Sequence, residues 1–214
     1  MSQDPSAVPR RSWFTLWVVA LAVVLILPRA QAGEGSEAAA RAVVEHLQTA
    51  LLEAMRTPAY QERYRRLAPV IEQTHDLDLI ARAALGRDLW SDLDTRDRDR
   101  YLDLFRKMSI ATYAREFSGF SGERFEIVSV RPVRRKGVLV RTLLHKADGG
   151  TVELDYHLRE RNGQWRIVNV LSDGVSDLAL KRDQYRAVVR DRGFGGLLAE
   201  LEAQSRPPSA TSTP

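Results

Sequence analysis

Hydrophobic and polar residues alternate along residues 152–159 of the chain. The apolar members are Val152, Leu154, Tyr156 and Leu158, and the residues between them are charged or histidine. A period of two is typical of a strand with one buried face. Asn162-Gly163 follows, a dipeptide that supplies the two positive-φ residues of a type I′ turn, and residues 165–170 are again rich in strand-forming side chains. The pattern therefore predicts a β-hairpin, which residues 138–145 extend to an antiparallel meander across a turn at Gly149-Gly150.

Apolar positions spaced three and four residues apart predict helices before the meander. The first helix begins near Glu37, and its stripe consists of Ala40, Val43, Val44, Leu47, Leu51 and Met55. Thr57-Pro58 has the form of an N-cap followed by proline at the first helical position, so we expect a second helix there, with an interruption at Pro69. Asp76 or Asp78 then caps a short helix that ends at Gly86.

A longer helix and a first strand complete the region before the meander. Thr95 begins what we expect to be the longest helix of the chain, which stops at Gly119. Residues 124–132 are predicted to form the first strand. After the meander, residues 178–189 are predicted to be helical, with a break at Gly193 and a closing apolar segment over residues 197–201.

These elements predict an α+β fold, in which N-terminal and C-terminal helices cover one face of an antiparallel meander sheet. The apolar face of the sheet is predicted to carry Val140, Leu154, Tyr156, Trp165 and Ile167. These residues are expected to face Phe105, Met108 and Phe117 of the long helix, with Glu153, Asp155 and His157 on the opposite face. The same residue types line a packed core and a cavity, so periodicity leaves that choice open.

The N-terminus has the composition of a secretory signal peptide. Arg10-Arg11 precedes an apolar run over residues 13–27, and Ala30-Gln31-Ala32 offers a small-x-small cleavage site. The alternative is a retained membrane anchor, but the run is shorter than the roughly 20 residues that span a bilayer. We therefore expect a signal peptide over residues 1–32, a periplasmic domain over residues 33–204 and a disordered tail over residues 205–214.

Charge and cysteine content exclude several classes of function. Loss of residues 1–32 removes three arginines and one aspartate and lowers the net charge from +4 to +2, which gives no support for nucleic-acid binding. The chain has no cysteine, so it has neither a disulfide framework nor a thiol nucleophile. Its four histidines show no spacing that places two metal ligands on one helix face. We expect no cofactor and no metal.

Two groups of residues are candidates for specific chemistry. Asp155 and His157 lie two apart on one strand face and are able to share a proton, as in some small cone-shaped α+β domains, but their face is predicted to point away from the core. Four cations surround the turn after the first strand, namely Arg131, Arg134, Arg135 and Lys136. This basic turn is either a solvated hairpin tip or a docking site for anionic headgroups or an acidic partner.

Several short motifs follow one another in a fixed order along the chain. They are residues 78–86, Trp90, Thr95 with Phe105 and Tyr113, Leu154-Asp155-Tyr156, Gly163 with residues 165–170, Gly174-Val175-Ser176, and Gly193-Phe194 before Leu197-Leu198. In their order and spacing these motifs resemble the MlaC-type (toluene-tolerance) family of periplasmic lipid-binding proteins. The resemblance covers residues 36–204. Residues 172–182 are most similar to the hopanoid-biosynthesis-associated branch called HpnM, because Asp177-Leu178-Ala179-Leu180 departs from the Asn-Tyr-Arg type of sequence usual in the common branch.

The resemblance implies an NTF2-like fold that encloses an apolar cavity for the acyl chains of a phospholipid. It implies a monomeric carrier rather than an enzyme, which shuttles lipid between an outer-membrane lipoprotein and porin complex and an inner-membrane ABC transporter complex. The eight residues predicted to lie between sheet and helix would then contact the lipid. The HpnM likeness leaves a hopanoid or related terpenoid as the alternative cargo.

Overall fold

The computed structural model describes residues 31–134 and 137–208. Its helices are α1 (Gln31–Met55), α2 (Tyr60–Thr74), α3 (Leu77–Leu85), α4 (Arg87–Asp92), α5 (Thr95–Glu116) and α6 (Asp177–Ser205). Its strands are β1 (Arg124–Val133), β2 (Gly137–His145), β3 (Thr151–Arg161), β4 (Gln164–Ser172) and β5 (Val175–Ser176). The predicted signal peptide lies outside the described residues except for Gln31 and Ala32, and so does the predicted tail beyond residue 208.

The strands form one antiparallel sheet in the order β1-β2-β3-β4-β5, so the predicted meander is confirmed. The turn between β3 and β4 has positive φ at both Asn162 and Gly163, as a type I′ hairpin requires. A second turn of the same kind, at Asp173-Gly174, adds the short strand β5, which the sequence did not predict.

Helix boundaries agree with the sequence where a side chain caps the helix. Asp76 accepts a hydrogen bond from the backbone N–H of Leu79 and caps α3, and Gly86 ends that helix at φ +89°. The break predicted at Gly193 is also present, since this residue has φ +68° inside α6.

Other helix predictions were wrong. The second helix begins at Tyr60 rather than at Thr57-Pro58, because the Thr57 hydroxyl donates back to the Glu53 carbonyl of α1 and therefore caps no helix. Pro69 lies exposed inside α2 without ending it. The α5 helix, capped by Asp94, is shorter than α1 and α6. The one-and-a-half-turn helix α4 was missed.

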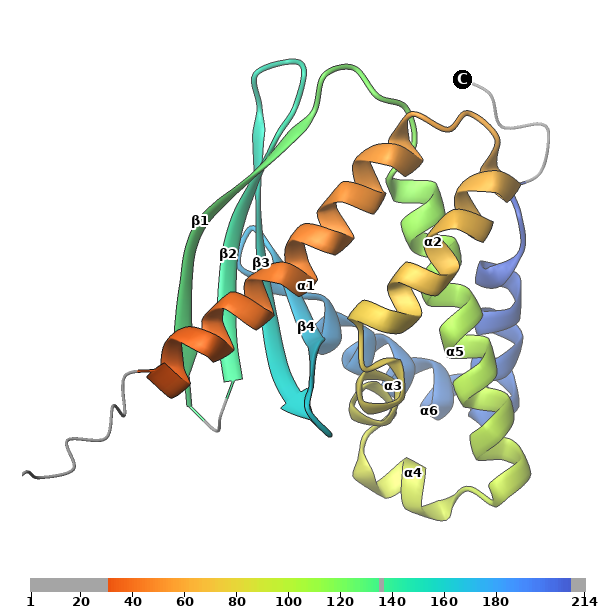
Figure 1. Cartoon of the computed structure of the whole chain (residues 1–214). Helices are drawn as coiled ribbons and strands as arrows, with labels where there is room; N and C mark the ends of the chain where they lie inside the picture. The colour runs from red at the N-terminus through yellow and green to blue at the C-terminus, as the bar shows by residue number, and fades with distance from the viewer. Residues whose placement is uncertain (1–30, 135–136, 209–214) are drawn as a thin grey trace, which may run out of the picture.

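Figure 1 shows α1 running obliquely across one face of the sheet. The helices α2, α3, α5 and α6 lie on the other side of α1 from strand β1. The α1 helix contacts β1, β2 and β4, and α5 packs against both α2 and α6. A single hydrophobic core includes residues from all these elements. This arrangement is the α+β architecture expected from the sequence.

Arg63 of α2 joins three parts of the helical layer. It is buried, and its guanidinium donates hydrogen bonds to the carbonyl oxygens of Ala114 at 2.9 Å, Thr57 at 2.9 Å and Pro58 at 2.6 Å. These carbonyls lie at the end of α5 and in the α1–α2 connection. A buried carbonyl without a donor is costly, so Arg63 fixes the ends of these helices relative to one another.

We predict that Arg63→Met lowers the free energy of unfolding by about 2–4 kcal/mol, because it leaves buried carbonyls without donors. Arg65→Met, at an exposed position on the same helix, is the matched control and should change stability by no more than about 0.5 kcal/mol. Urea unfolding of the two variants measures the difference. Equal stability of both variants would contradict the role of Arg63.

Candidate functional site

The eight residues predicted to line the space between sheet and helix belong to the hydrophobic core or pack directly against it. Five are buried, namely Phe105, Met108, Val140, Tyr156 and Ile167, and three are partly exposed, namely Phe117, Leu154 and Trp165. Val140 pairs with Tyr156 across β2 and β3, and Leu158 pairs with Ile167 across a bulge between β3 and β4. The strand residues of the set therefore share one face of the sheet.

On the central strands, the burial of inward-facing apolar residues falls from the β1–β2 turn toward the β2–β3 turn. Two inward-facing residues depart from this trend: Thr142, opposite Leu154, is fully buried, and Pro132, opposite Val138, is exposed. Near the β1–β2 turn, Val138, Leu158 and Ile167 are fully buried. Toward the β2–β3 turn, the inward-facing residues Phe125, Ile127, Leu144, Leu154 and Val170 are only partly buried. In Figure 1, α1 crosses the sheet at the first of these ends and leaves it obliquely. The helices therefore cover the apolar face incompletely at the β2–β3 end.

Aromatic side chains border this incompletely covered end. The Tyr113 and Phe117 rings of α5 are stacked with centroids 5.9 Å apart, and the Phe117 and Phe125 centroids are 6.5 Å apart. In the loop between α5 and β1, Phe120 lies 4.0 Å below the guanidinium of Arg56. Tyr113, Phe125 and Ile127 were not predicted to belong to the site, although the alternation of Phe125 and Ile127 along the first strand marks them as inward-facing.

His75 fixes the position of Tyr113. The Thr74 hydroxyl donates to the Val70 carbonyl at 2.7 Å, so it can only accept from Nδ1–H of His75, at 2.9 Å. The remaining nitrogen, Nε2, then accepts from the Tyr113 hydroxyl at 2.9 Å. Burial lowers the pKa of His75 to about 4, which agrees with a neutral ring in this arrangement.

The outward face of the sheet carries Asp155 and His157, as predicted. Asp155 forms an ion pair with Arg141 at 3.3 Å, and Glu153 pairs with the same guanidinium at 2.7 Å. Partial burial lowers the pKa of His157. Among the described residues, no hydrogen bond joins Asp155 and His157, and the Asp155 carboxylate is paired with Arg141 instead.

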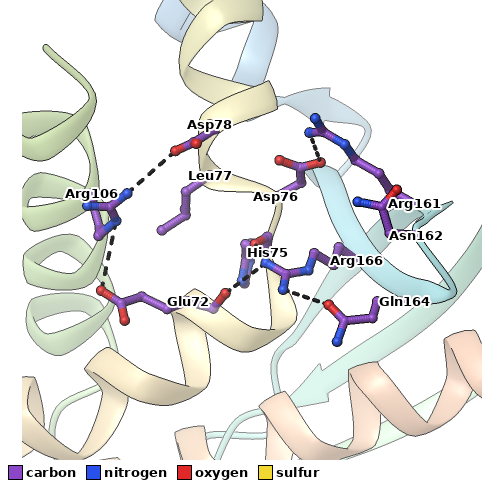
Figure 2. A pocket seen from close by; sticks show the side chains of 10 residues that line it. All are labelled: Glu72, His75, Asp76, Leu77, Asp78, Arg106, Arg161, Asn162, Gln164 and Arg166. Carbon is purple, nitrogen blue, oxygen red and sulfur yellow. Dashed lines mark hydrogen bonds and ion pairs between the residues drawn. The ribbon is translucent and has the colours of Figure 1, made fainter. Parts of the chain in front are cut away.

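Ten residues line a polar hollow of about 480 Å³ at the β3–β4 turn (Figure 2). They are Glu72, His75, Asp76, Leu77, Asp78, Arg106, Arg161, Asn162, Gln164 and Arg166. Its charges are paired within the hollow: Arg106 with Glu72 and Asp78, and Arg161 with Asp76. Arg166 donates to Gln164 and to the carbonyls that end α2. We interpret this hollow as a structural junction of α2, α3, α5 and the hairpin.

The basic turn is described only in part. Arg131 and Arg134 are exposed at the end of β1, whereas Arg135 and Lys136 lie outside the described residues. Arg134 borders a second hollow, of about 450 Å³. None of the eight predicted lipid-contacting residues lines either hollow. Within residues 31–134 and 137–208, no helix is long and apolar enough to cross a membrane, and no group of His, Asp or Glu is placed to hold a metal ion.

We predict that acidification destabilises the protein through His75. Its folded-state pKa of about 4 lies below the unfolded value of about 6.5, so the unfolded chain takes up the proton first. The contribution of His75 to stability is complete above pH 6.5 and is lost as the pH falls toward 4, by about 2 kcal/mol between pH 7.5 and pH 5. Urea unfolding at these two pH values measures this loss.

His75→Gln should flatten this pH dependence, and His46→Gln, at an exposed position of α1, should leave it as in the wild type. His157 contributes with the same sign, so some dependence should remain in the first variant. An unchanged slope in His75→Gln would contradict the neutral, hydrogen-bonded ring.

Comparison with known proteins agrees with the fold and with the family resemblance. Among solved structures, the chain is similar to the phospholipid-binding protein from Ralstonia solanacearum, whose structure contains a phospholipid. The TM-score is 0.68 at 21% sequence identity, over 79% of this chain and 96% of that chain. At this identity the match shows the fold, which is the NTF2-like α+β fold expected from the sequence. The sequence model described as "MlaC protein" matches residues 41–203. The chain therefore belongs to the MlaC family.

Proposed function

We propose that this protein is a periplasmic lipid carrier. It binds the acyl chains of a lipid between the sheet and the helices, and it transfers the whole lipid between membrane complexes of an ABC transport system. The observation that carries the proposal is the inward face of the sheet, which is apolar along most of its length but only partly covered at its β2–β3 end. Apolar surface left open on one side of a core marks a site for an apolar partner.

Hydrocarbon burial provides the binding energy for such a carrier. Each methylene that leaves water contributes about 0.8 kcal/mol, so two acyl chains contribute on the order of 20 kcal/mol before the costs of binding are subtracted. Spontaneous release into water is then very slow, and a carrier requires complexes at both membranes to accept its cargo. The phospholipid found in the Ralstonia protein supports this proposal for a chain of the same fold.

The alternative cargo is a hopanoid or related terpenoid. A rigid polycyclic molecule and a two-tailed phospholipid need differently shaped cavities, and the HpnM-like segment over residues 172–182 favours the terpenoid. Native mass spectrometry of the protein purified without added lipid identifies the cargo by its mass. A mass without any bound lipid, together with an activity that His157→Ala abolishes, would instead favour the enzyme that we considered from the sequence.

We predict that Leu154→Trp blocks cargo binding at little cost to stability, because Leu154 is only partly buried and, in the proposed carrier, the larger side chain would fill space that the cargo occupies. Leu158→Trp is the matched control, on the same face of the same strand but fully buried, where overpacking typically costs about 1–3 kcal/mol. Bound lipid and the unfolding midpoint are measured for both. If Leu154→Trp retained its lipid and lost stability, the residue would belong to the packed core instead.

A second prediction concerns the basic turn as a docking site for the membrane complexes. Reversal of Arg131 and Arg134 to Glu should slow lipid transfer at low salt and leave bound cargo unchanged, because exposed charges mainly set the rate of encounter. The rate of lipid transfer to acceptor complexes is measured at two ionic strengths. Transfer that is equally fast in the variant at low salt would exclude this docking site.

A further inference from the structure

The second hollow lies where the sheet ends at the β1–β2 turn, between α3 and the first turn of α6. Its volume is about 450 Å³, within the range of about 300–1,000 Å³ that is common for small-molecule sites. Its apolar lining residues are Leu79, Ala83, Val133, Val168 and Leu178, together with Leu158, whose side chain faces inward. We call it the β1–β2 hollow. It is bordered by outward-facing residues of β3 and β4, on the side of the sheet opposite to the core that α1 covers.

The polar side chains that line this hollow are those of Arg134, His157, Arg159 and Asn169, which include two guanidinium donors and no carboxylate. Arg134 and Arg159 are exposed at its border, and neither forms an ion pair with a described carboxylate. The side-chain oxygen of Asn169 already accepts from the Ser176 hydroxyl at 3.1 Å and from the Leu178 N–H at 3.4 Å. Its NH₂ group is therefore the part of the amide that remains for a ligand.

The two hollows differ in charge. In the polar hollow of Figure 2, Arg106 and Arg161 each pair with a carboxylate of the same hollow. No Asp or Glu lines the β1–β2 hollow, where two guanidinium groups adjoin apolar walls. A guanidinium without a carboxylate partner is a strong donor to an oxyanion, and apolar walls favour a hydrocarbon chain. The chemistry of this hollow therefore fits an anion that carries an apolar chain.

We propose that the β1–β2 hollow binds an anionic amphiphile, with a carboxylate or phosphate at Arg134 and Arg159 and a single hydrocarbon chain against Leu79 and Leu178. This site is separate from the interior cargo site and does not depend on it. Its ligand class is that of fatty acids and single-chain phospholipids, and the acid group, rather than the chain alone, determines binding.

Titration calorimetry of the full chain, as purified, tests the site with three probes: decanoate, decanol and inorganic phosphate. Decanoate should bind with a stoichiometry of one and shift the side-chain amide signal of Asn169 in the NMR spectrum. Decanol and phosphate each lack one half of the recognised chemistry and should bind at least about tenfold more weakly. Binding of decanol as tight as that of decanoate, or binding of phosphate alone at equal affinity, would overturn the proposal.

Arg134→Gln with Arg159→Gln should weaken decanoate binding about tenfold or more. The matched control is Arg65→Gln with Arg186→Gln. It also removes two positive charges, but from exposed positions outside the hollow, and it should leave the affinity for decanoate unchanged. An equal loss in both double variants would show only non-specific attraction. Co-purified lipid should persist in the Arg134 and Arg159 variant, and its loss there would show that the hollow is part of the cargo site. A wild-type protein without any interior lipid would contradict the proposed carrier function but not this site.

Discussion

The apolar inward face of the β2–β3 pair is the constraint on which the rest of this fold depends. Two adjacent strands present Val138, Val140, Tyr156 and Leu158 to one side, and all four are fully buried. A sheet with such a face is stable only when another layer covers it, and α1 supplies that layer across its width. Of the remaining helices, α2 packs on α1, while α3 and α6 contact β4 and pack on each other and on α5. Arg63 and His75 join the ends of α2 and α5. The oblique course of α1 decides which part of the face is sealed and which part stays open.

Much of this fold is predictable from local pattern because its strands are neighbours in sequence. Alternation fixes the inward face, and Asn162-Gly163 fixes the register of the central hairpin, since a one-residue shift would reverse every side chain. Helix ends are predictable where one side chain decides them, as at Asp76. They are not predictable at Thr57, because its hydroxyl has a competing acceptor in the preceding turn of α1.

For the candidate site, the sequence predicts which residues share one face of the sheet, but it does not predict how deeply each of them is buried. Alternation assigns Val140, Leu154 and Tyr156 to one side, but it contains no information on how far a helix covers each of them. That depends on the angle at which α1 crosses the strands, which is a tertiary property. Two of these three residues are therefore buried in the core while Leu154 borders the open end. The same limit explains why Phe125 and Tyr113, on elements that meet only in the folded chain, were not recognised.

In the proposed carrier function, β3 separates two requirements that would otherwise conflict. A carrier holds hydrocarbon out of water and is also recognised by partners while it is loaded. Because side chains alternate along a strand, Leu154 and Tyr156 face the interior while Asp155 and His157 face outward, and no residue serves both purposes. The outward carboxylates are held by Arg141, so the outer surface is ordered independently of what the interior contains. Of the two carboxylates, Asp155 is buried and Glu153 is partly exposed, and partly exposed charges change the rate of encounter more than the stability of a buried complex. Substitutions at inward-facing positions of β3 should therefore change the retention of cargo, and substitutions at outward-facing positions should change recognition by partners, without either affecting the other.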